Sequence, residues 1–266
     1  MTKLRDIIEV IEQVAPPGLA EGWDNSGFQL GDMDAACSKV LVALDPLPEV
    51  FEEAQRIGAG LVVTHHPLFF GELKSLDFAN GRGAVVRAAA KAGIALYAAH
   101  TSYDSANPGV SDALGAAVGA KGMRPLTPSA QNPGAGLGRM GELPEKTTVV
   151  QLARLVKERL GAGSVRIIGE PGRVVGTAAF CGGSGSSGID AAKASGADVY
   201  ITGDIKYHDA LKAIEMGLAV LDAGHYATEN IAVRALAKAL KDGLDARGLS
   251  VEVFVGSAQR EPWTTV

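Results

Sequence analysis

Histidines gather in two short stretches of this sequence that lie far apart. One stretch reads Thr64-His65-His66-Pro67, and the other runs from Asp222 to Glu229 and contains His225. A further histidine, His100, follows another apolar run. Imidazole and carboxylate groups are the usual ligands of first-row transition metals, so these residue types predict a divalent-metal site.

Each of these histidine positions follows an apolar run that is typical of a buried strand. The runs are residues 61–63, 94–99 and 218–221. In parallel sheets, ligands bind outside the carboxyl ends of the strands, which favours a common site for the residues placed there.

Carboxylates accompany two of the histidines. Asp104 lies shortly after His100, and Glu229 lies four residues after His225, so that on a helix His225 and Glu229 would share one face. With His65 and His66 these residues make five candidate ligands, more than the three that a single catalytic zinc needs. Five ligands suit two ions that share a carboxylate.

The adjacent pair His65-His66 imposes a geometric condition on this interpretation. Successive residues of a strand point to opposite faces, so both rings can meet only if the strand has ended or if each serves a different ion. Pro67 favours the first case. The alternative is one buried, hydrogen-bonded histidine and one at the surface.

The alternation of apolar runs with helical periodicity predicts an α/β protein. Its sheets should be parallel or mostly parallel and flanked by helices. The stretch 126–138 is rich in Pro and Gly and marks the best domain boundary. We therefore expect a first α/β domain over 1–125, completed by 218–266, and a second over 126–217. Helices are expected over 4–14, 48–57, 84–92, 148–160 and 229–245.

Composition excludes several classes of protein. The chain has 266 residues, 47% of them hydrophobic, and a net charge of −5 without a block of Lys or Arg, so no nucleic-acid partner is expected. No apolar run reaches the ~20 residues of a membrane helix. The N-terminus has no signal-peptide core, which predicts a cytoplasmic protein. Cys37 and Cys181 suggest neither a disulfide framework nor a thiolate metal site.

A glycine-rich loop, Gly182–Gly188, leaves three interpretations open. Gly183, Gly185 and Gly188 match the G-x-G-x-x-G fingerprint, and Asp204 follows, as in a nicotinamide-dependent oxidoreductase. However, the helix after the loop is short for that fold, so no cofactor-binding residues are assigned. The loop could instead be a packing turn, or it could hold a substrate anion.

The joint pattern of motifs resembles the NGG-one-interacting-factor-three-like family, many of whose members carry the name GTP cyclohydrolase I type 2. The motifs span nearly the whole chain and are Trp23-Asp24-Asn25-Ser26-Gly27, Thr64-His65-His66-Pro67, His100-Thr101-Ser102-Tyr103-Asp104, Gly136-Leu137-Gly138-Arg139-Met140-Gly141, Thr202-Gly203-Asp204 and Asp222 to Glu229. The resemblance implies a two-domain α/β protein that assembles as a ring-shaped homo-hexamer. It also implies two metals per subunit, held by His65, His66, Asp104, His225 and Glu229.

The function predicted from these residues is that of a dinuclear divalent-metal protein acting as a hydrolase on a nucleotide or another phosphorylated small molecule. The ions could be Zn, Fe, Mn, Co or Ni, because the ligand types do not choose among them. His100, outside the five ligands, is the candidate catalytic residue, for proton transfer or for orienting a ligand. The alternative is a metal-trafficking protein, a metallochaperone without turnover, so whether the chain is an enzyme stays open.

Overall fold

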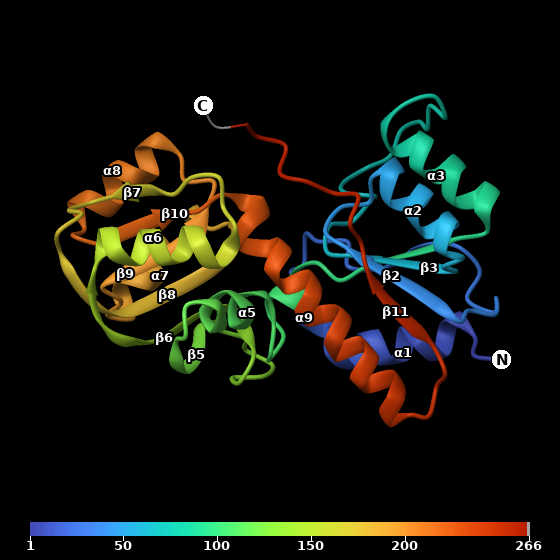
Figure 1. Ribbon diagram of the computed structural model, residues 1–266, viewed down its shortest axis with the longest axis horizontal. Helices are drawn as coiled ribbons and strands as arrows, with labels where there is room; N and C mark the ends of the chain where they lie inside the picture. The colour runs from blue at the N-terminus through green and yellow to red at the C-terminus, as the bar shows by residue number, and fades with distance from the viewer. Residues whose placement is uncertain (265–266) are drawn as a thin grey trace. The chain divides into compact units, whose positions relative to one another are not determined.

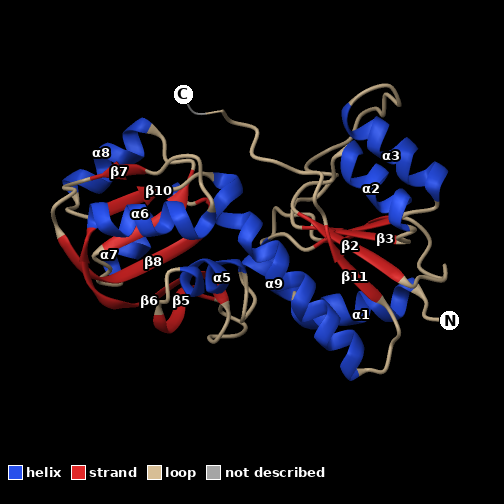
Figure 2. Ribbon diagram, in the orientation of Figure 1, coloured by secondary structure: helices blue, strands red, loops and turns tan. Residues whose placement is uncertain are grey.

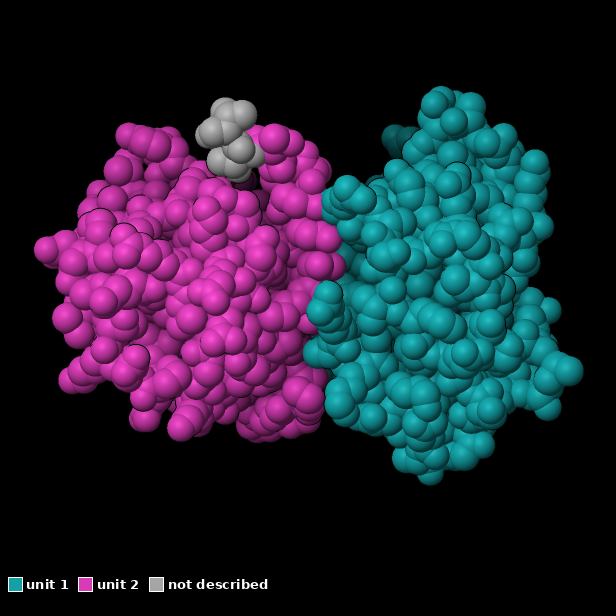
Figure 3. Space-filling view, viewed as in Figure 1, with its two compact units in different colours: residues 1–106, 233–260 teal, residues 107–232, 261–266 magenta. Residues whose placement is uncertain are grey.

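The computed structural model describes residues 1–264, which form two compact units (Figure 3). Unit 1 comprises Met1–Ala106 and Val233–Arg260, and unit 2 comprises Asn107–Ala232 with the C-terminal residues from Glu261. The chain therefore leaves unit 1 before residue 125 and returns to it after residue 217, unlike the expected domain boundaries.

Unit 1 contains a five-stranded sheet in the order β1-β4-β3-β2-β11 (Figure 2). Strands β2, β3, β4 and β11 pair in parallel, and only β1 joins the edge antiparallel to β4. The bounds are β1 Gly27–Leu30, β2 Lys39–Ala43, β3 Leu61–Thr64, β4 Ala95–Ala98 and β11 Glu252–Val255. Strand β1 begins at Gly27, the last residue of the Trp23–Gly27 motif.

Helices cover both faces of this sheet. Figure 1 shows α2 (Pro48–Ile57) and α3 (Gly81–Ala92) on one face, and α1 (Leu4–Val14) with the later part of α9 (His225–Ala246) on the other. Alternation along the strands supplies both cores, because successive side chains of a strand point to opposite faces. The core between the sheet and helices α2 and α3 contains Leu41, Val62 and Leu96 from the strands, with Phe51 and Val85 from the helices.

Unit 2 contains a six-stranded sheet in the order β5-β6-β8-β9-β10-β7. Strands β8, β9 and β10 are parallel, whereas β5–β6, β6–β8 and β10–β7 are antiparallel, so this sheet is mixed rather than mostly parallel. The bounds are β5 Lys121–Pro128, β6 Gly136–Thr148, β7 Arg166–Ile168, β8 Val174–Ser184, β9 Val199–Gly203 and β10 Ala219–Asp222.

The difference in the domain boundary has a local cause. The Pro- and Gly-rich stretch 126–138 contains the turn of a hairpin whose strands β5 and β6 belong to one sheet. Antiparallel neighbours need only a short connection, so turn-forming residues mark hairpins as well as domain linkers. The preceding helix α5 (Val110–Ala117) packs Leu114 into the same core, which places residues from Asn107 onward in unit 2.

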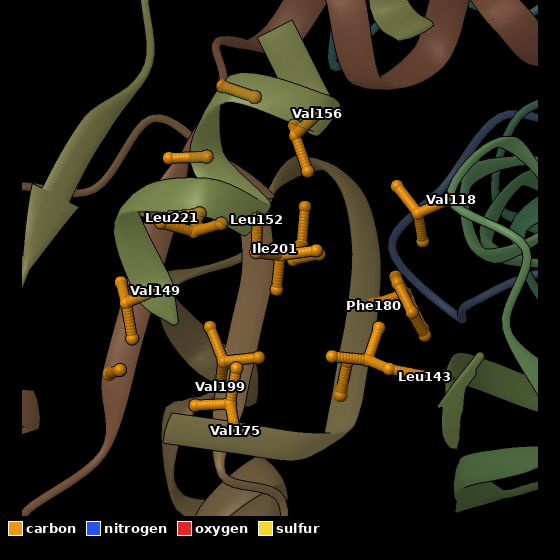
Figure 4. Close-up of a cluster of buried hydrophobic side chains, with 14 of the residues drawn as sticks. Val118, Leu143, Val149, Leu152, Val156, Val175, Phe180, Val199, Ile201 and Leu221 are labelled. Atoms are coloured by element: carbon orange, nitrogen blue, oxygen red, sulfur yellow. The ribbon is translucent and has the colours of Figure 1, made fainter. Parts of the chain in front are cut away.

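Helices also cover both faces of the second sheet. On one face, α5 and α6 (Val149–Leu160) enclose a core that includes Leu152, Val156, Phe180 and Ile201 (Figure 4). On the other face lie α7 (Ile189–Ala194) and α8 (Tyr207–Glu215). Among the described residues, no helix is long and apolar enough to cross a membrane.

The motif around Gly136–Arg139 has a structural role in unit 2. The side chain of Arg139 is only 1% exposed, and its Nε and Nη2 pair with the two carboxylate oxygens of Asp112 on α5 at 2.9 and 2.8 Å. Its Nη1 donates to the carbonyls of Gly136 and Gly138, both at 2.8 Å. These bonds tie the hairpin to α5.

We predict that Asp112→Ala lowers the free energy of unfolding by ~3–5 kcal/mol, because it leaves a buried guanidinium without its carboxylate. Asp190→Ala is the matched control, since Asp190 pairs with Lys212 on the surface, and it should cost less than ~1 kcal/mol. Urea unfolding followed by circular dichroism measures both. Equal losses in the two variants would contradict the structural role of the buried pair.

Candidate metal centre

The register of the parallel strands places three polar residues side by side in unit 1. Ala43, Thr64 and Ala98 lie next to one another on β2, β3 and β4. Two residues beyond each of these positions come Asp45, His66 and His100. Because the strands run in parallel, these residues leave the sheet at one edge.

His65, His66 and His100 form a trio in unit 1. Their ring centroids lie 5.1 Å (His65–His66), 5.2 Å (His65–His100) and 5.5 Å (His66–His100) apart. One ligand nitrogen of each lies within 4.8 Å of the others, a spacing that could hold a metal ion. The two adjacent rings meet because β3 ends at Thr64, whose hydroxyl donates to the His66 carbonyl at 2.7 Å.

An oxygen atom holds the Nδ1 of every histidine in this trio. The partners are the carbonyl oxygen of Ala99 for His65 (2.8 Å), a carboxylate oxygen of Asp45 for His66 (2.6 Å) and one of Asp24 for His100 (2.7 Å). A carbonyl or ionised carboxylate oxygen only accepts, so Nδ1 carries the proton. The lone pair is then on Nε2, the state in which a histidine binds a metal.

Asp24 is an ionised carboxylate inside a network of donors. Burial by itself would raise the pKa of this carboxyl, but hydrogen bonds from His100, Ser26 and Thr101 hold the pKa well below its usual range. The Ser26 and Thr101 hydroxyls both donate at 2.6 Å. Asp24 therefore fixes the His100 ring through a hydrogen bond from Nδ1.

Asp104 brings a carboxylate to the trio. It is the last residue of the short helix α4 (Thr101–Asp104), and its N–H donates to the His100 carbonyl at 3.0 Å. This turn returns the side chain toward the strand ends, where Oδ1 lies 3.7 Å from Nε2 of the buried His65. The structure thus brings His65, His66, His100 and Asp104 together within unit 1.

His225 and Glu229 form a second group in unit 2. Helix α9 begins at His225, four residues earlier than predicted, so both residues lie on its first turns. Nε2 of His225 is 3.0 Å from Oε2 of Glu229, which is 5% exposed. Nδ1 of His225 contacts Oδ2 of Asp204 at 2.7 Å, which repeats the arrangement of the trio.

Asp204 has an unusual backbone conformation. Its φ of 54° makes it the only non-glycine residue with positive φ in the described part of the chain. Such conformations cost free energy and concentrate at functional positions. Here the conformation directs the carboxylate from the end of β9 toward His225.

The glycine-rich loop packs against this second group. Gly183 has a φ of +65°, and a Cβ at this position would overlap Oε1 of Glu229. A Cβ at Gly185 would instead meet the hydroxyls of Thr202 and Tyr200, and one at Gly188 would meet that of Tyr200. The three glycines therefore let the loop pack closely against side chains of the protein, and α7 after the loop spans only Ile189–Ala194. This arrangement favours the packing-turn interpretation of the loop.

The sequence analysis did not assign the residues that orient the histidines. These are Asp24, Asp45 and Asp204, together with the carbonyl of Ala99. Asp45 and Asp204 each follow a strand, and Asp24 lies in the Trp-Asp-Asn motif. These positions in the sequence could have suggested a functional role for the three carboxylates. Their partners, however, depend on strand register and on contacts distant in sequence.

We predict that Gly183→Ala lowers metal binding, because the added methyl group would displace the Glu229 carboxylate. Gly161→Ala is the control, since Gly161 has nearly the same φ of +64° but nothing lies within 4 Å of its Cβ position. Isothermal titration of metal-free protein with Zn²⁺ and Mn²⁺ measures the effect. Equal metal binding by the two variants would show that Gly183 does not support Glu229.

Known proteins resemble this chain over nearly its whole length. The Duf34/NIF3 (NGG1p interacting factor 3) family matches residues 2–262. The "GTP cyclohydrolase 1 type 2 homolog" of Streptomyces coelicolor is 39% identical over 99% of this chain and 94% of its own length. The "Protein NIF3 homolog" of Schizosaccharomyces pombe is 30% identical, over 97% and 96%. The crystal structure of a Bacillus cereus protein related to NIF3 superposes with a TM-score of 0.95 at 26% identity, covering 100% of this chain and 99% of the other. The chain therefore belongs to the Duf34/NIF3 family.

Proposed function

We propose that this protein is a dinuclear, divalent-metal-dependent hydrolase that acts on a nucleotide or another phosphorylated small molecule. The proposed ligands are His65, His66, Asp104, His225 and Glu229. His100 is the proposed catalytic residue.

The observation that carries this proposal is the common orientation of the imidazoles. Four histidines in two units each hold Nδ1 against an oxygen atom at 2.6–2.8 Å. Chance surface histidines have no reason to repeat this pattern, whereas a hydrogen-bonded Nδ1 is the usual companion of a metal-binding Nε2. The fifth histidine, His208, lies exposed on α8 and packs against Tyr207 instead.

The donor set fits divalent transition metals. Imidazole with carboxylate suits Zn, Fe, Mn, Co or Ni, and no cysteine belongs to the set. Paired ions in hydrolases lower the pKa of bound water to ~7 and polarise phosphoryl oxygens.

His100 is suited to move a proton. The Asp24 carboxylate accepts from its Nδ1 at 2.7 Å and so fixes the ring, whose centroid lies 5.2 Å from that of His65. A positioned histidine with a carboxylate partner is the usual arrangement for general acid–base catalysis. The same convergence of rings also suits a direct metal ligand, and the variants described below separate the two roles.

An anionic substrate is supported by a hollow beside His66. A cavity of about 270 Å³ in unit 1 is lined by Asp45, Pro67 and the exposed Arg82, among others. The guanidinium group of Arg82 can neutralise a phosphate group there.

A second candidate function is metal trafficking without turnover. The side chain of His225 is 34% exposed and that of its partner Asp204 is 49% exposed. Ligands open to solvent favour exchange of an ion with an acceptor. Transfer of metal to a chelator or acceptor protein, without turnover of any phosphorylated compound, would favour this function.

The proposal includes assembly as a ring-shaped homo-hexamer in the cytoplasm. It rests on the resemblance described from the sequence motifs, together with the usual closed symmetry of oligomers.

We predict that the reconstituted protein binds about two divalent ions per chain. Glu229→Ala should remove at least one of them, because it deletes a proposed ligand. Glu158→Ala, which changes an exposed glutamate of α6, should retain both. Elemental analysis after desalting counts the ions. Less than half an ion per chain in the wild-type protein would refute the metal centre.

We also predict that His66→Ala abolishes turnover, whereas His100→Ala lowers kcat by ~10²–10⁴-fold and keeps its metals, as loss of a general acid–base group does. His208→Ala should resemble the wild type. The assay is turnover of a panel of nucleotides and phosphorylated metabolites, with elemental analysis of each variant. If His100→Ala loses its metals as completely as His66→Ala, then His100 is a ligand and its assigned role is wrong.

A further inference from the structure

Two exposed aromatic side chains border the histidine trio of unit 1. Trp23 is 63% exposed and Phe70 is 46% exposed. Their ring centroids lie 5.8 Å apart in an edge-to-face arrangement. The centroid of the His100 ring lies 6.1 Å from that of Trp23 and 6.2 Å from that of Phe70. Both rings therefore lie beside His100, the member of the trio that they contact.

Hydrogen bonds hold the two aromatic segments in place. Asn25 Nδ2 donates to the carbonyl of Phe69 at 2.7 Å, and the Phe69 N–H donates to Gln29 Oε1 at 3.2 Å. Gln29 Nε2 in turn donates to the carbonyl of Asn25 at 2.8 Å. These bonds link Asn25 and Gln29, which follow Trp23 in the chain, with Phe69, the neighbour of Phe70. A ligand that binds to these rings would therefore immobilise little additional protein backbone.

The loop that carries Trp23 also orients His100, the proposed catalytic residue. Asp24, directly after Trp23, accepts from His100 Nδ1 at 2.7 Å and from the Thr101 backbone N–H at 3.1 Å. Asp24 thus fixes the position of Trp23 relative to His100 through adjacent peptide units. A group that rests on the indole consequently has a defined distance to the trio.

The chemistry of the surface selects one class of occupant. Trp and Phe rings bind planar π systems by stacking, and they do so without reading individual hydrogen-bonding groups. Aromatic rings also bind cations, but divalent ions at the proposed centre would repel a cationic group so close to His100. Stacking on the aromatic rings and repulsion of cations by the proposed metal ions together favour a neutral, planar heteroaromatic ring.

We propose that Trp23, supported by Phe70, is the site at which the heteroaromatic ring of the substrate stacks, and that it positions the remainder of the molecule toward His100. This inference rests on the proposed function for the identity of the reacting group, but not for ring binding itself. Trp23 is a positioning residue, since it acts through the placement of the substrate. The substrate class is thereby narrowed to phosphorylated compounds that carry a planar base.

The test uses the fluorescence of Trp23. The chain has two tryptophans, so the Trp263→Phe variant leaves Trp23 as the sole one. Titration of this variant with guanosine, in metal-loaded and chelator-treated protein, should quench the emission in both states. Ribose 5-phosphate, which has a phosphate but no base, should not quench it. Absence of quenching by millimolar guanosine would overturn the inference.

Affinity measurements then separate stacking from a structural effect. Trp23→Ala should bind guanosine about 10- to 100-fold more weakly by calorimetry, while Trp23→Phe retains most of the affinity. Phe78→Ala, which removes a 53% exposed ring elsewhere in unit 1, should bind like the wild type. Equal affinity of Trp23→Ala and Phe78→Ala would overturn the inference.

Two controls keep this inference distinct from the proposed function. Light scattering should give Trp23→Ala the same assembly mass as the wild type, and a lower mass would assign Trp23 to a contact between copies and overturn the inference. Elemental analysis of the wild type decides the metal centre separately. If the reconstituted wild type holds no metal but guanosine still quenches Trp23, ring stacking is supported and the metal-dependent hydrolase is refuted. If the reconstituted wild type holds its metals but guanosine does not quench Trp23, the metal centre stands and ring stacking is refuted.

Discussion

The orientation of four imidazole rings is the constraint on which the candidate metal centre depends. A histidine ring can turn either nitrogen outward, and only a hydrogen bond to one nitrogen fixes the other. In this protein an oxygen atom holds Nδ1 in every case, from Ala99, Asp45, Asp24 or Asp204. Nε2 is therefore the nitrogen presented by each ring. If the acceptor were removed, the histidine would remain, but its ring would no longer be held with Nε2 in the position of a candidate ligand.

These acceptors lie far from their histidines in the sequence, and the fold must bring them together. Asp24 lies 76 residues from His100, and the Ala99 carbonyl lies 34 residues from His65. The three parallel strands β2, β3 and β4 of unit 1 solve this problem, because their register brings Asp45, His66 and His100 to the same edge. In unit 2 the parallel pair β9–β10 does the same for Asp204 and the residues that begin α9. Strand register thus sets the positions of the candidate ligands in both units.

Small residues and turns complete the arrangement. Gly183 lets the loop after β8 approach Glu229, and the end of β3 lets two adjacent histidines converge. In the loop after η1 (Pro17–Leu19), Asp24 orients His100 while Trp23 stays exposed. If that exposed ring receives the base of a substrate, one loop would serve both substrate binding and proton transfer. The motif Trp23-Asp24-Asn25 then has a separate physical role for each residue.

The sequence alone determined the α/β class, most helices, and the residues that end the apolar strands, since periodicity and side-chain type are local properties. It also grouped His65, His66, His100 and Asp104 at strand ends, because parallel strands share an edge. Only the tertiary structure decided which oxygen holds each imidazole, that β1 joins the first sheet and that the second sheet is mixed. It also decided that residues 126–138 contain a hairpin turn inside unit 2. These features depend on register and on pairing between distant segments, where many partners are compatible with one local pattern and packing selects among them.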